Sequence, residues 1–143
     1  MSPPTETELS SALRISVMRL SRRMRQERSS DSGLTATQLA AMATLRRHGP
    51  ITAGELAAHE KVSPPSMTRI LGHLSDLGMV ERRSHPTDGR QVLVELSETG
   101  ATLLAADRRR RDEWLAERLR ELAPAEREQL RDVVGILDRL AGG

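Results

Sequence analysis

A run of small polar and basic side chains, Ser66, Thr68, Arg69 and His73, lies within eight residues of the 143-residue chain. Such side chains hydrogen-bond to base edges in the major groove of DNA when they project from the first turns of a helix. No acidic residue occurs from Val62 to Ser75, although the chain contains 20 Asp and Glu, and acids there would repel phosphate. The alternative is that these residues are only the solvated face of an amphipathic helix, and their types alone favour neither reading.

Three arginines, Arg82, Arg83 and Arg90, form a second set of candidates around the hexapeptide HPTDGR, residues 85–90. Asp-Gly is a strong turn signal, so these arginines are expected in one hairpin. A guanidinium at the tip of a hairpin can enter the narrow, electronegative minor groove of DNA. Asp88 could pair with Arg90 and direct its side chain, although an exposed ion pair contributes under about 1 kcal/mol.

Two short helices are predicted to position the first set. The sequence of residues 52–55, TAGE, fits a capping box and predicts a helix from 53 to about 60. After a two-residue turn, Ser63 begins a second helix with prolines at its first two positions, where prolines are tolerated. Since Pro65 has no N–H, Ser63 should cap the N–H of Ser66. The prolines also remove two N–H groups that could bind a phosphate, so phosphate contacts are expected from Ser63, Ser66 and the arginines.

An apolar stripe should bury the second of these helices against the rest of the unit. It consists of Met67, Ile70, Leu71, Leu74 and Leu77, and Gly78 follows as a C-terminal cap. Segments 79–84 and 91–96 then predict two strands, the second with Val92, Val94 and Leu96 on one face. A helix-turn-helix followed at once by an arginine-tipped hairpin is more specific than either part alone.

Amphipathic helices flank this unit on both sides. The first helix, from residue 7, carries Leu9, Leu13, Val17, Leu20 and Met24 at helical spacing, and the last carries Leu130, Val133, Val134, Leu137 and Leu140. Another helix begins with the capping box Thr35–Gln38 and stops at Gly49-Pro50. The two outer stripes exceed what one winged-helix core can cover, so burial on a symmetry-related copy is the economical solution. An isolated intramolecular bundle is the alternative.

Composition narrows the function classes. The chain has no cysteine, which excludes disulfides and thiolate metal sites, and Trp114 is its only aromatic residue, which argues against base-stacking platforms. The four histidines show no metal-ligand spacing and no nucleotide-binding motif occurs, so we expect no enzyme, no cofactor and no metal. No apolar run reaches the roughly 20 residues of a membrane span and no signal peptide is evident, so a cytoplasmic protein is expected.

The chain resembles the MarR (multiple antibiotic resistance regulator) family over nearly its whole length. The most specific segments are LTATQLAAMATL, ITAGELAAHEKVSPPSMTRILGHLSDLGMVERR and HPTDGRQVLVELSETG. The family pattern has an aspartate and an arginine at the wing tip, which Asp88 and Arg90 match. It also has a passage from recognition helix to wing that residues 77–80 and Arg82 match approximately. His85 departs from the pattern, because the family usually has an acidic residue there.

The resemblance implies a mainly α (α+β) fold, a winged helix-turn-helix with N- and C-terminal dimerisation helices, in a single domain over residues 1–143. Residues 7–30 and 98–141 would be the dimerisation helices, and residues 34–97 the DNA-binding region. The candidate DNA-binding residues are Ser63, Ser66, Thr68, Arg69, His73, Arg82, Arg83, Asp88 and Arg90.

The resemblance also implies a function: a homodimeric regulator, most often a repressor, that binds a palindromic operator in double-stranded DNA. Some members respond to a small ligand in the crevice between the two regions, although the scarcity of aromatic residues leaves no obvious lining for a phenolic ligand. The alternative is a winged-helix protein–protein interaction module without an operator. That alternative would require an apolar patch on the helix face from Ser66 to Asp76, where the sequence is polar.

Overall fold

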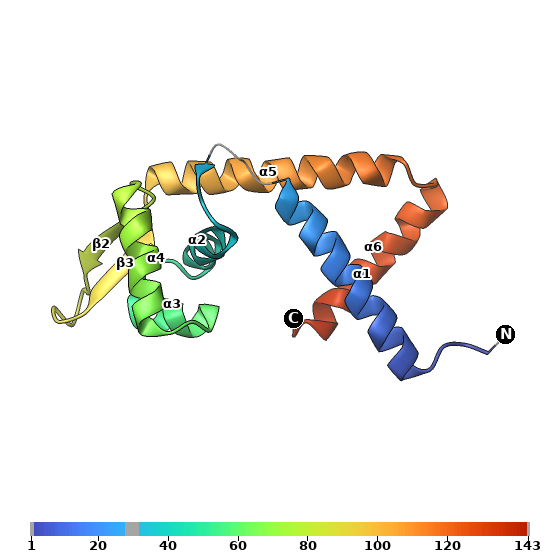
Figure 1. Ribbon diagram of the computed structural model, residues 1–143, viewed down its shortest axis with the longest axis horizontal. Helices are drawn as coiled ribbons and strands as arrows, with labels where there is room; N and C mark the ends of the chain where they lie inside the picture. Colours follow the sequence, from blue (N-terminus) through green and yellow to red (C-terminus); the bar gives the residue numbers. More distant parts are fainter. Residues whose placement is uncertain (1, 28–31, 143) are drawn as a thin grey trace. The chain divides into compact units, whose positions relative to one another are not determined.

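Residues 2–27 and 32–142, which the computed structural model describes, form six helices and a three-stranded antiparallel sheet (Figure 1). The helices are α1 (Glu6–Gln26), α2 (Ala36–His48), α3 (Ala53–Glu60), α4 (Pro64–Asp76), α5 (Glu98–Arg120) and α6 (Pro124–Leu140). The strands are β1 (Ile51–Thr52), β2 (Val80–Ser84) and β3 (Val92–Leu96). The predicted mainly α fold with a winged helix-turn-helix is confirmed, while the predicted end of the first helix at 28–30 lies outside the described residues.

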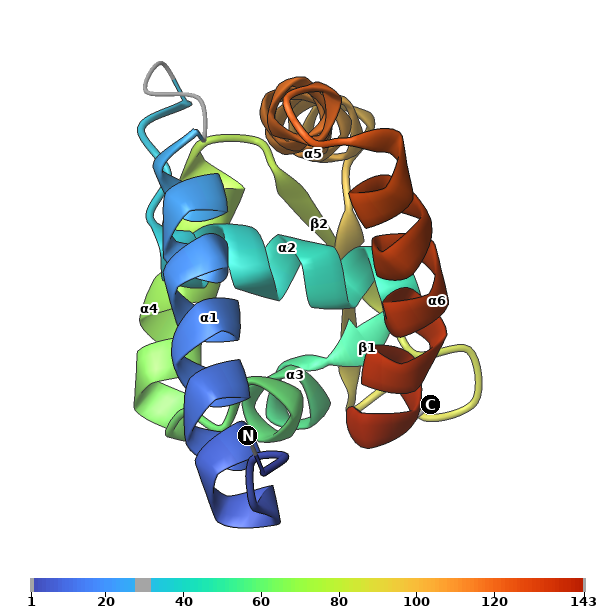
Figure 2. The same ribbon diagram turned by 90° about the vertical axis from the view of Figure 1, so that its right-hand side faces the viewer.

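These elements group into two units. The first, ending at Arg109, contains α2, α3, α4, the sheet and the first half of α5. The second contains α1, the rest of α5 from Arg110, and α6, which turns away from the end of α5 (Figure 2). The candidate DNA-binding residues all belong to the first unit.

Local hydrogen bonds start the helices of the first unit largely as predicted. The Thr35 hydroxyl accepts the N–H of Gln38 at 3.2 Å, and the Gln38 side chain accepts the N–H of Thr35 at 2.9 Å, which completes the predicted capping box. Thr52 caps α3 through the N–H of Glu55 at 3.1 Å. The Glu55 carboxylate, however, accepts from the Thr52 hydroxyl and not from its N–H, so the predicted second capping box forms only in part.

The core of the first unit lies between α2, α3, α4, the sheet and α5. Its fully buried side chains include Met42, Leu45, Leu56, Met67, Leu71, Leu74, Val94 and Leu104. Ile70 packs against this core from a half-buried position. The prediction that Leu77 is buried is wrong, since 42% of it is exposed. The helix ends at Asp76 and the chain reverses at Gly78, whose φ is +72°, so Leu77 leaves the buried stripe.

The sheet has the order β1-β3-β2, and β2 and β3 pair from Val80 with Leu96 to Ser84 with Val92. Because β1 pairs only with Leu93 and Val94, the far end of the β2–β3 hairpin extends beyond the sheet. Val92, predicted to share one face with Val94, is therefore 50% exposed, whereas Val94 is buried. Leu93, on the opposite face, is buried instead, which the alternation of residue types did not predict.

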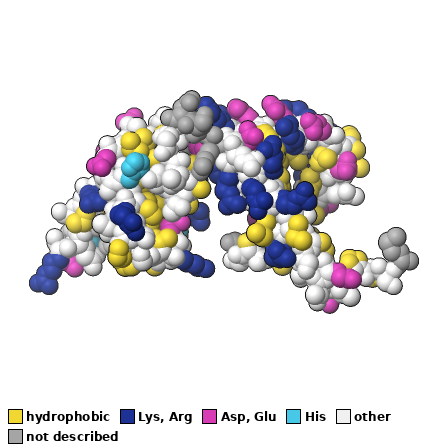
Figure 3. Space-filling model, in the orientation of Figure 1, with side chains coloured by type: hydrophobic (Ala, Val, Ile, Leu, Met, Phe, Trp, Pro, Cys, Tyr) yellow, Lys and Arg dark blue, Asp and Glu magenta, His cyan; other side chains and the backbone are white. Residues whose placement is uncertain are grey.

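The second unit has no such core. Neither α1 nor α6 contains a buried residue. The guanidinium groups of Arg23 and Arg118 lie over the ring of Trp114 in α5, at 5.3 Å and 5.1 Å from its centroid, and the contact with Arg23 joins α1 to α5. Hydrophobic side chains are visible on the surface over α1 and α6 (Figure 3).

The contrast between Leu74 and Leu77 gives a stability prediction. Leu74→Ala opens a cavity in the core and should lower the free energy of unfolding by about 2–5 kcal/mol. Leu77→Ala removes a side chain that is already exposed and should lower it by less than about 1 kcal/mol. Urea unfolding at one fixed protein concentration measures both, and equal losses would contradict the burial described here.

Candidate nucleic-acid interface

The start of α4 is held by two serines. The Ser63 hydroxyl oxygen accepts the N–H of Ser66 at 3.3 Å, and its proton is donated to the Ser66 hydroxyl oxygen at 2.9 Å. Pro64 and Pro65 occupy the first two helical positions, as the sequence predicted. Ser63 thus has a structural role as the helix cap, and it occupies the N–H of Ser66, the first N–H at this end of α4.

The outward face of α4 brings the first set of candidates together. Ser66 is half-buried, while Thr68, Arg69 and His73 are exposed. Ser66, Arg69 and His73 follow one another at helical spacing, so they share one face. The Thr68 hydroxyl donates to the carbonyl oxygen of Pro64 at 3.0 Å, which leaves its oxygen lone pairs and its methyl group available. This face can therefore offer donors and acceptors to base edges without an acidic neighbour in α4 before Asp76.

The wing separates the second set of candidates. Neighbouring residues of a strand point to opposite faces, so Arg82 and Arg83 cannot both face the same groove. The Arg83 Nε lies 3.9 Å from Oε1 of Glu95 on the partner strand, an exposed ion pair. Arg82 and Arg90 are exposed and form no ion pair with any residue in the described part of the chain. Among the three wing arginines, these two are the freer ones for a nucleic-acid phosphate or groove.

Side chains fix the backbone at the wing tip. The Asp88 carboxylate accepts the backbone N–H of Arg90 at 3.1 Å, and no ion pair joins it to the Arg90 guanidinium within the described chain. The prediction of an Asp88–Arg90 ion pair is therefore wrong. A short Asp side chain accepts a backbone N–H two residues farther along the chain more readily than it pairs with the end of a long side chain. Nδ1 of His85 accepts the N–H groups of Thr87 and Asp88, each at 3.2 Å. His85 thus orders the turn, a role its residue type alone did not reveal.

Lys61 is a candidate contact that the sequence reasoning missed. It stands in the turn of the helix-turn-helix with φ +54°, a left-handed conformation that is uncommon for residues other than glycine. Lys61 is exposed and is the only lysine of the chain. Its position two residues before Ser63 puts a positive charge beside the start of α4. The unusual φ, which draws attention to Lys61, is visible only in the structure.

Other kinds of site find no support in the described residues. No three His, Asp or Glu side chains of residues 2–27 and 32–142 come together as they would around a metal ion. None of the described helices is long and apolar enough to cross a lipid bilayer.

Known proteins match both the sequence and this geometry. A profile of the MarR family matches residues 34–92, which contain the helix-turn-helix and most of the wing. An uncharacterized HTH-type transcriptional regulator of Mycobacterium bovis is 49% identical over 133 residues, 93% of this chain and 92% of that protein. The chain belongs to the MarR family. Its resemblance to that family, based on the wing and recognition-helix segments, is thereby confirmed.

Two further proteins are similar to the chain in sequence or in structure. The HTH-type transcriptional repressor NicR of Pseudomonas putida is 36% identical over 81 residues, 57% of this chain and 51% of NicR. The crystal structure of apo MarR from Escherichia coli superposes with a TM-score of 0.73 at 25% identity and covers 96% of this chain and 98% of that one. The protein is a MarR-family transcriptional regulator that binds DNA through its helix-turn-helix.

The wing tip gives a prediction that separates two roles of Asp88. Asp88→Asn keeps an oxygen that can accept the Arg90 N–H, so the turn should stay ordered, whereas Asp88→Ala removes it. Amide hydrogen exchange at Arg90 should be close to wild type in the Asn variant and about tenfold faster or more in the Ala variant. Equal acceleration in both would show that the charge of Asp88, and not its hydrogen bond, orders the tip.

Proposed function

We propose that this MarR-family protein is a homodimeric repressor that recognises a palindromic operator, with α4 in the major groove and the wing in the minor groove. The observation that carries the proposal is the outward face of α4, which has no acidic residue before Asp76 and is followed by a hairpin with exposed arginines. Ser66, Thr68, Arg69 and His73 would read base edges. Ser63, Arg82, Arg83 and Arg90 would contact phosphates or the minor groove, and Asp88 would hold the tip.

The second unit supports the dimer. The exposed fractions of Leu9, Val134 and Leu140 are 55%, 56% and 69%, although all three belong to apolar stripes. An open groove of about 580 Å³ lies between α1 and α6, lined by Leu13, Val17 and Leu137 among others. A second copy of the chain would bury these side chains and provide each dimer with two recognition helices related by twofold symmetry. Twofold symmetry in the protein calls for a palindromic operator.

Repression is supported by the similarity to NicR, which is named a repressor. The simplest physical mechanism of repression is that the dimer occupies DNA that the transcription machinery needs. This mechanism requires no catalytic group, and we propose no enzymatic activity. With no helix suited to span a bilayer among those described, we place its action on DNA in the cytoplasm.

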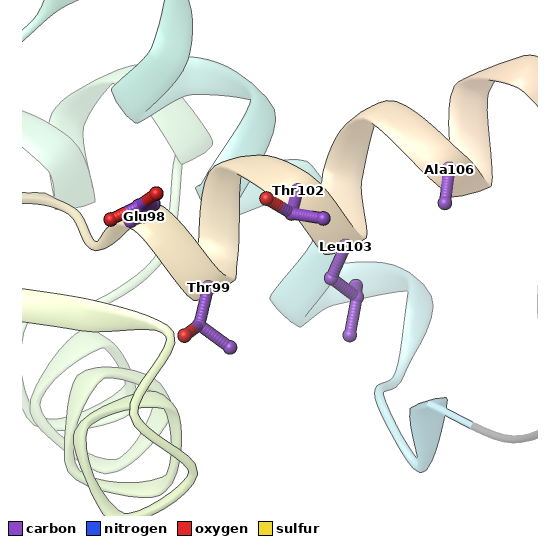
Figure 4. Close-up of a pocket in the computed structure, with 5 residues that line it drawn as sticks. All are labelled: Glu98, Thr99, Thr102, Leu103 and Ala106. Carbon is purple, nitrogen blue, oxygen red and sulfur yellow. The ribbon is translucent and has the colours of Figure 1, made fainter.

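We also propose that a small ligand relieves repression. The first turns of α5 border an open hollow of about 510 Å³, lined by Glu98, Thr99, Thr102, Leu103 and Ala106 (Figure 4). Thr99, Leu103 and Ala106 point to the same side of α5 in this view. Because the lining comes from a single helix, the hollow would need a further wall before it could enclose a small molecule.

Binding-site selection from random duplex DNA tests the function directly. Wild-type protein should return a palindromic consensus with half-site centres about 10 base pairs apart. Arg69→Ala should relax one position of each half-site, at a cost of about 1–3 kcal/mol, because a bidentate base contact is lost. Arg139→Ala on α6 is the matched control and should return the wild-type consensus. Enrichment of no duplex by the wild type would favour the protein–protein module.

The wing is tested by salt dependence. Arg90→Ala should weaken operator binding and reduce the slope of log K against log salt by about one, because one phosphate or groove contact disappears. Arg83→Ala should have the smaller effect, since Glu95 already pairs with that guanidinium. Titrations at several salt concentrations measure both, and an unchanged slope for Arg90→Ala would remove the wing from the mechanism.

A further inference from the structure

A single residue, Ser97, bonds to two of the three residues, 77–79, that connect the recognition helix to the wing. Its hydroxyl donates to the carbonyl oxygen of Gly78, and its backbone N–H donates to the carbonyl oxygen of Met79 at 3.0 Å. The same hydroxyl oxygen accepts the N–H of Gly100 at 2.9 Å and so caps α5. Because Ser97 is only 7% exposed, water cannot replace these bonds, and their loss would leave buried polar groups unpaired.

Gly100 brings the first turn of α5 against the same connection. A Cβ at position 100 would lie 2.1 Å from the carbonyl oxygen of Met79 and 3.0 Å from its carbonyl carbon. Both neighbours are backbone atoms, which cannot rotate out of the way as a flexible side chain can. Any other residue at 100 must therefore displace either α5 or Met79, and glycine is required here by close approach.

The connection at Gly78 and Met79 sets where the wing points. Gly78 reverses the chain after α4, and the Met79 N–H donates to the carbonyl oxygen of Leu74 in α4 at 2.9 Å. The next residue, Val80, begins the wing by pairing with Leu96, the residue before Ser97. The junction of Ser97 and Gly100 with Gly78 and Met79 thus ties the end of α4, the base of the wing and the start of α5 together.

A small rotation at this junction becomes a large displacement at the wing tip. From Val80 to Ser84 the strand extends about 13 Å, at about 3.3 Å per residue. A change of 10° at the base would move Ser84 by about 2 Å, which exceeds the tolerance of about 0.5 Å for a recognition geometry. The tip with Asp88 and Arg90 lies farther out and would move more.

We propose that Ser97 and Gly100 are positioning residues that fix the angle between the recognition helix and the wing, and thereby set the ratio of operator binding to non-specific DNA binding. This inference rests on the proposed function, because it takes α4 and the wing to contact one operator together. Non-specific binding depends on charge and tolerates a changed angle. Base reading requires both elements in register with the DNA, so the angle acts on selectivity.

The angle is measured first, without DNA. Because the chain has no cysteine, introducing Asp76→Cys on α4 and Gln91→Cys near the wing tip restricts the spin labels to these two positions. An excess of unlabelled chain suppresses distances between copies. Ser97→Ala and Gly100→Ala should broaden or shift the label–label distance distribution, and Ser97→Thr, which keeps the hydroxyl, should preserve it. Unchanged distributions in both disruptive variants would overturn the proposal.

Selectivity is measured second, with the selected operator and a scrambled duplex at one salt concentration. Ser97→Ala and Gly100→Ala should lower the affinity ratio about fivefold or more, while Ser97→Thr keeps it. Leu39→Val, a core change in α2, controls for lost stability, and Gly135→Ala in α6 controls for the glycine substitution, since only the Arg139 side chain lies near its Cβ position. Both controls should keep the wild-type ratio.

The outcomes separate the two proposals. Ratios within twofold of wild type in both disruptive variants, or an equal loss in Leu39→Val, would overturn the role of the junction in selectivity. If the wild type itself prefers no duplex while the label distances change, the proposed function fails and the role of the junction in setting the angle is supported.

Discussion

Burial of the apolar stripe of α4 is the constraint on which the recognition unit depends. Met67, Leu71 and Leu74 are at most 1% exposed, and they lock the rotation of α4 about its own axis against α2 and α3. Once that rotation is fixed, the opposite face with Arg69 and His73 must point outward. The same hydrophobic contacts that stabilise the unit therefore decide which side chains can reach DNA.

Short-range hydrogen bonds then refine what the core has fixed. Ser63 caps α4, and Asp88 and His85 hold the wing tip through backbone N–H groups. With a formal net charge of only +2, the protein is not broadly basic, so DNA recognition must depend on the placement of a few arginines. Ordering the backbone beneath those arginines reduces the conformational entropy that binding would otherwise cost.

The two units differ in how far they bury their apolar side chains. The first unit buries its core within one chain, while α1 and α6 of the second contain no buried residue and expose leucines and valines. A helix whose apolar stripe stays exposed depends on a partner for stability, because tertiary packing supplies most of the stability of a helix. In the proposed dimer, the second unit thus supplies the fixed spacing of two recognition units that the first cannot provide alone.

Features that depend on neighbours within a few residues could be predicted from the amino-acid sequence. Helical periodicity located α4 and its outward face, and the caps Thr35–Gln38 and Ser63–Ser66 formed as residue types and spacing required. Strand alternation could also have shown that Arg82 and Arg83 point to opposite faces. Where a buried face ends depends on the tertiary structure, as the exposed Leu77 and the buried Leu93 show. It alone brought Ser97 to Gly78 and Gly100 to Met79, because contacts between segments about 20 residues apart depend on how the elements pack, which periodicity does not encode.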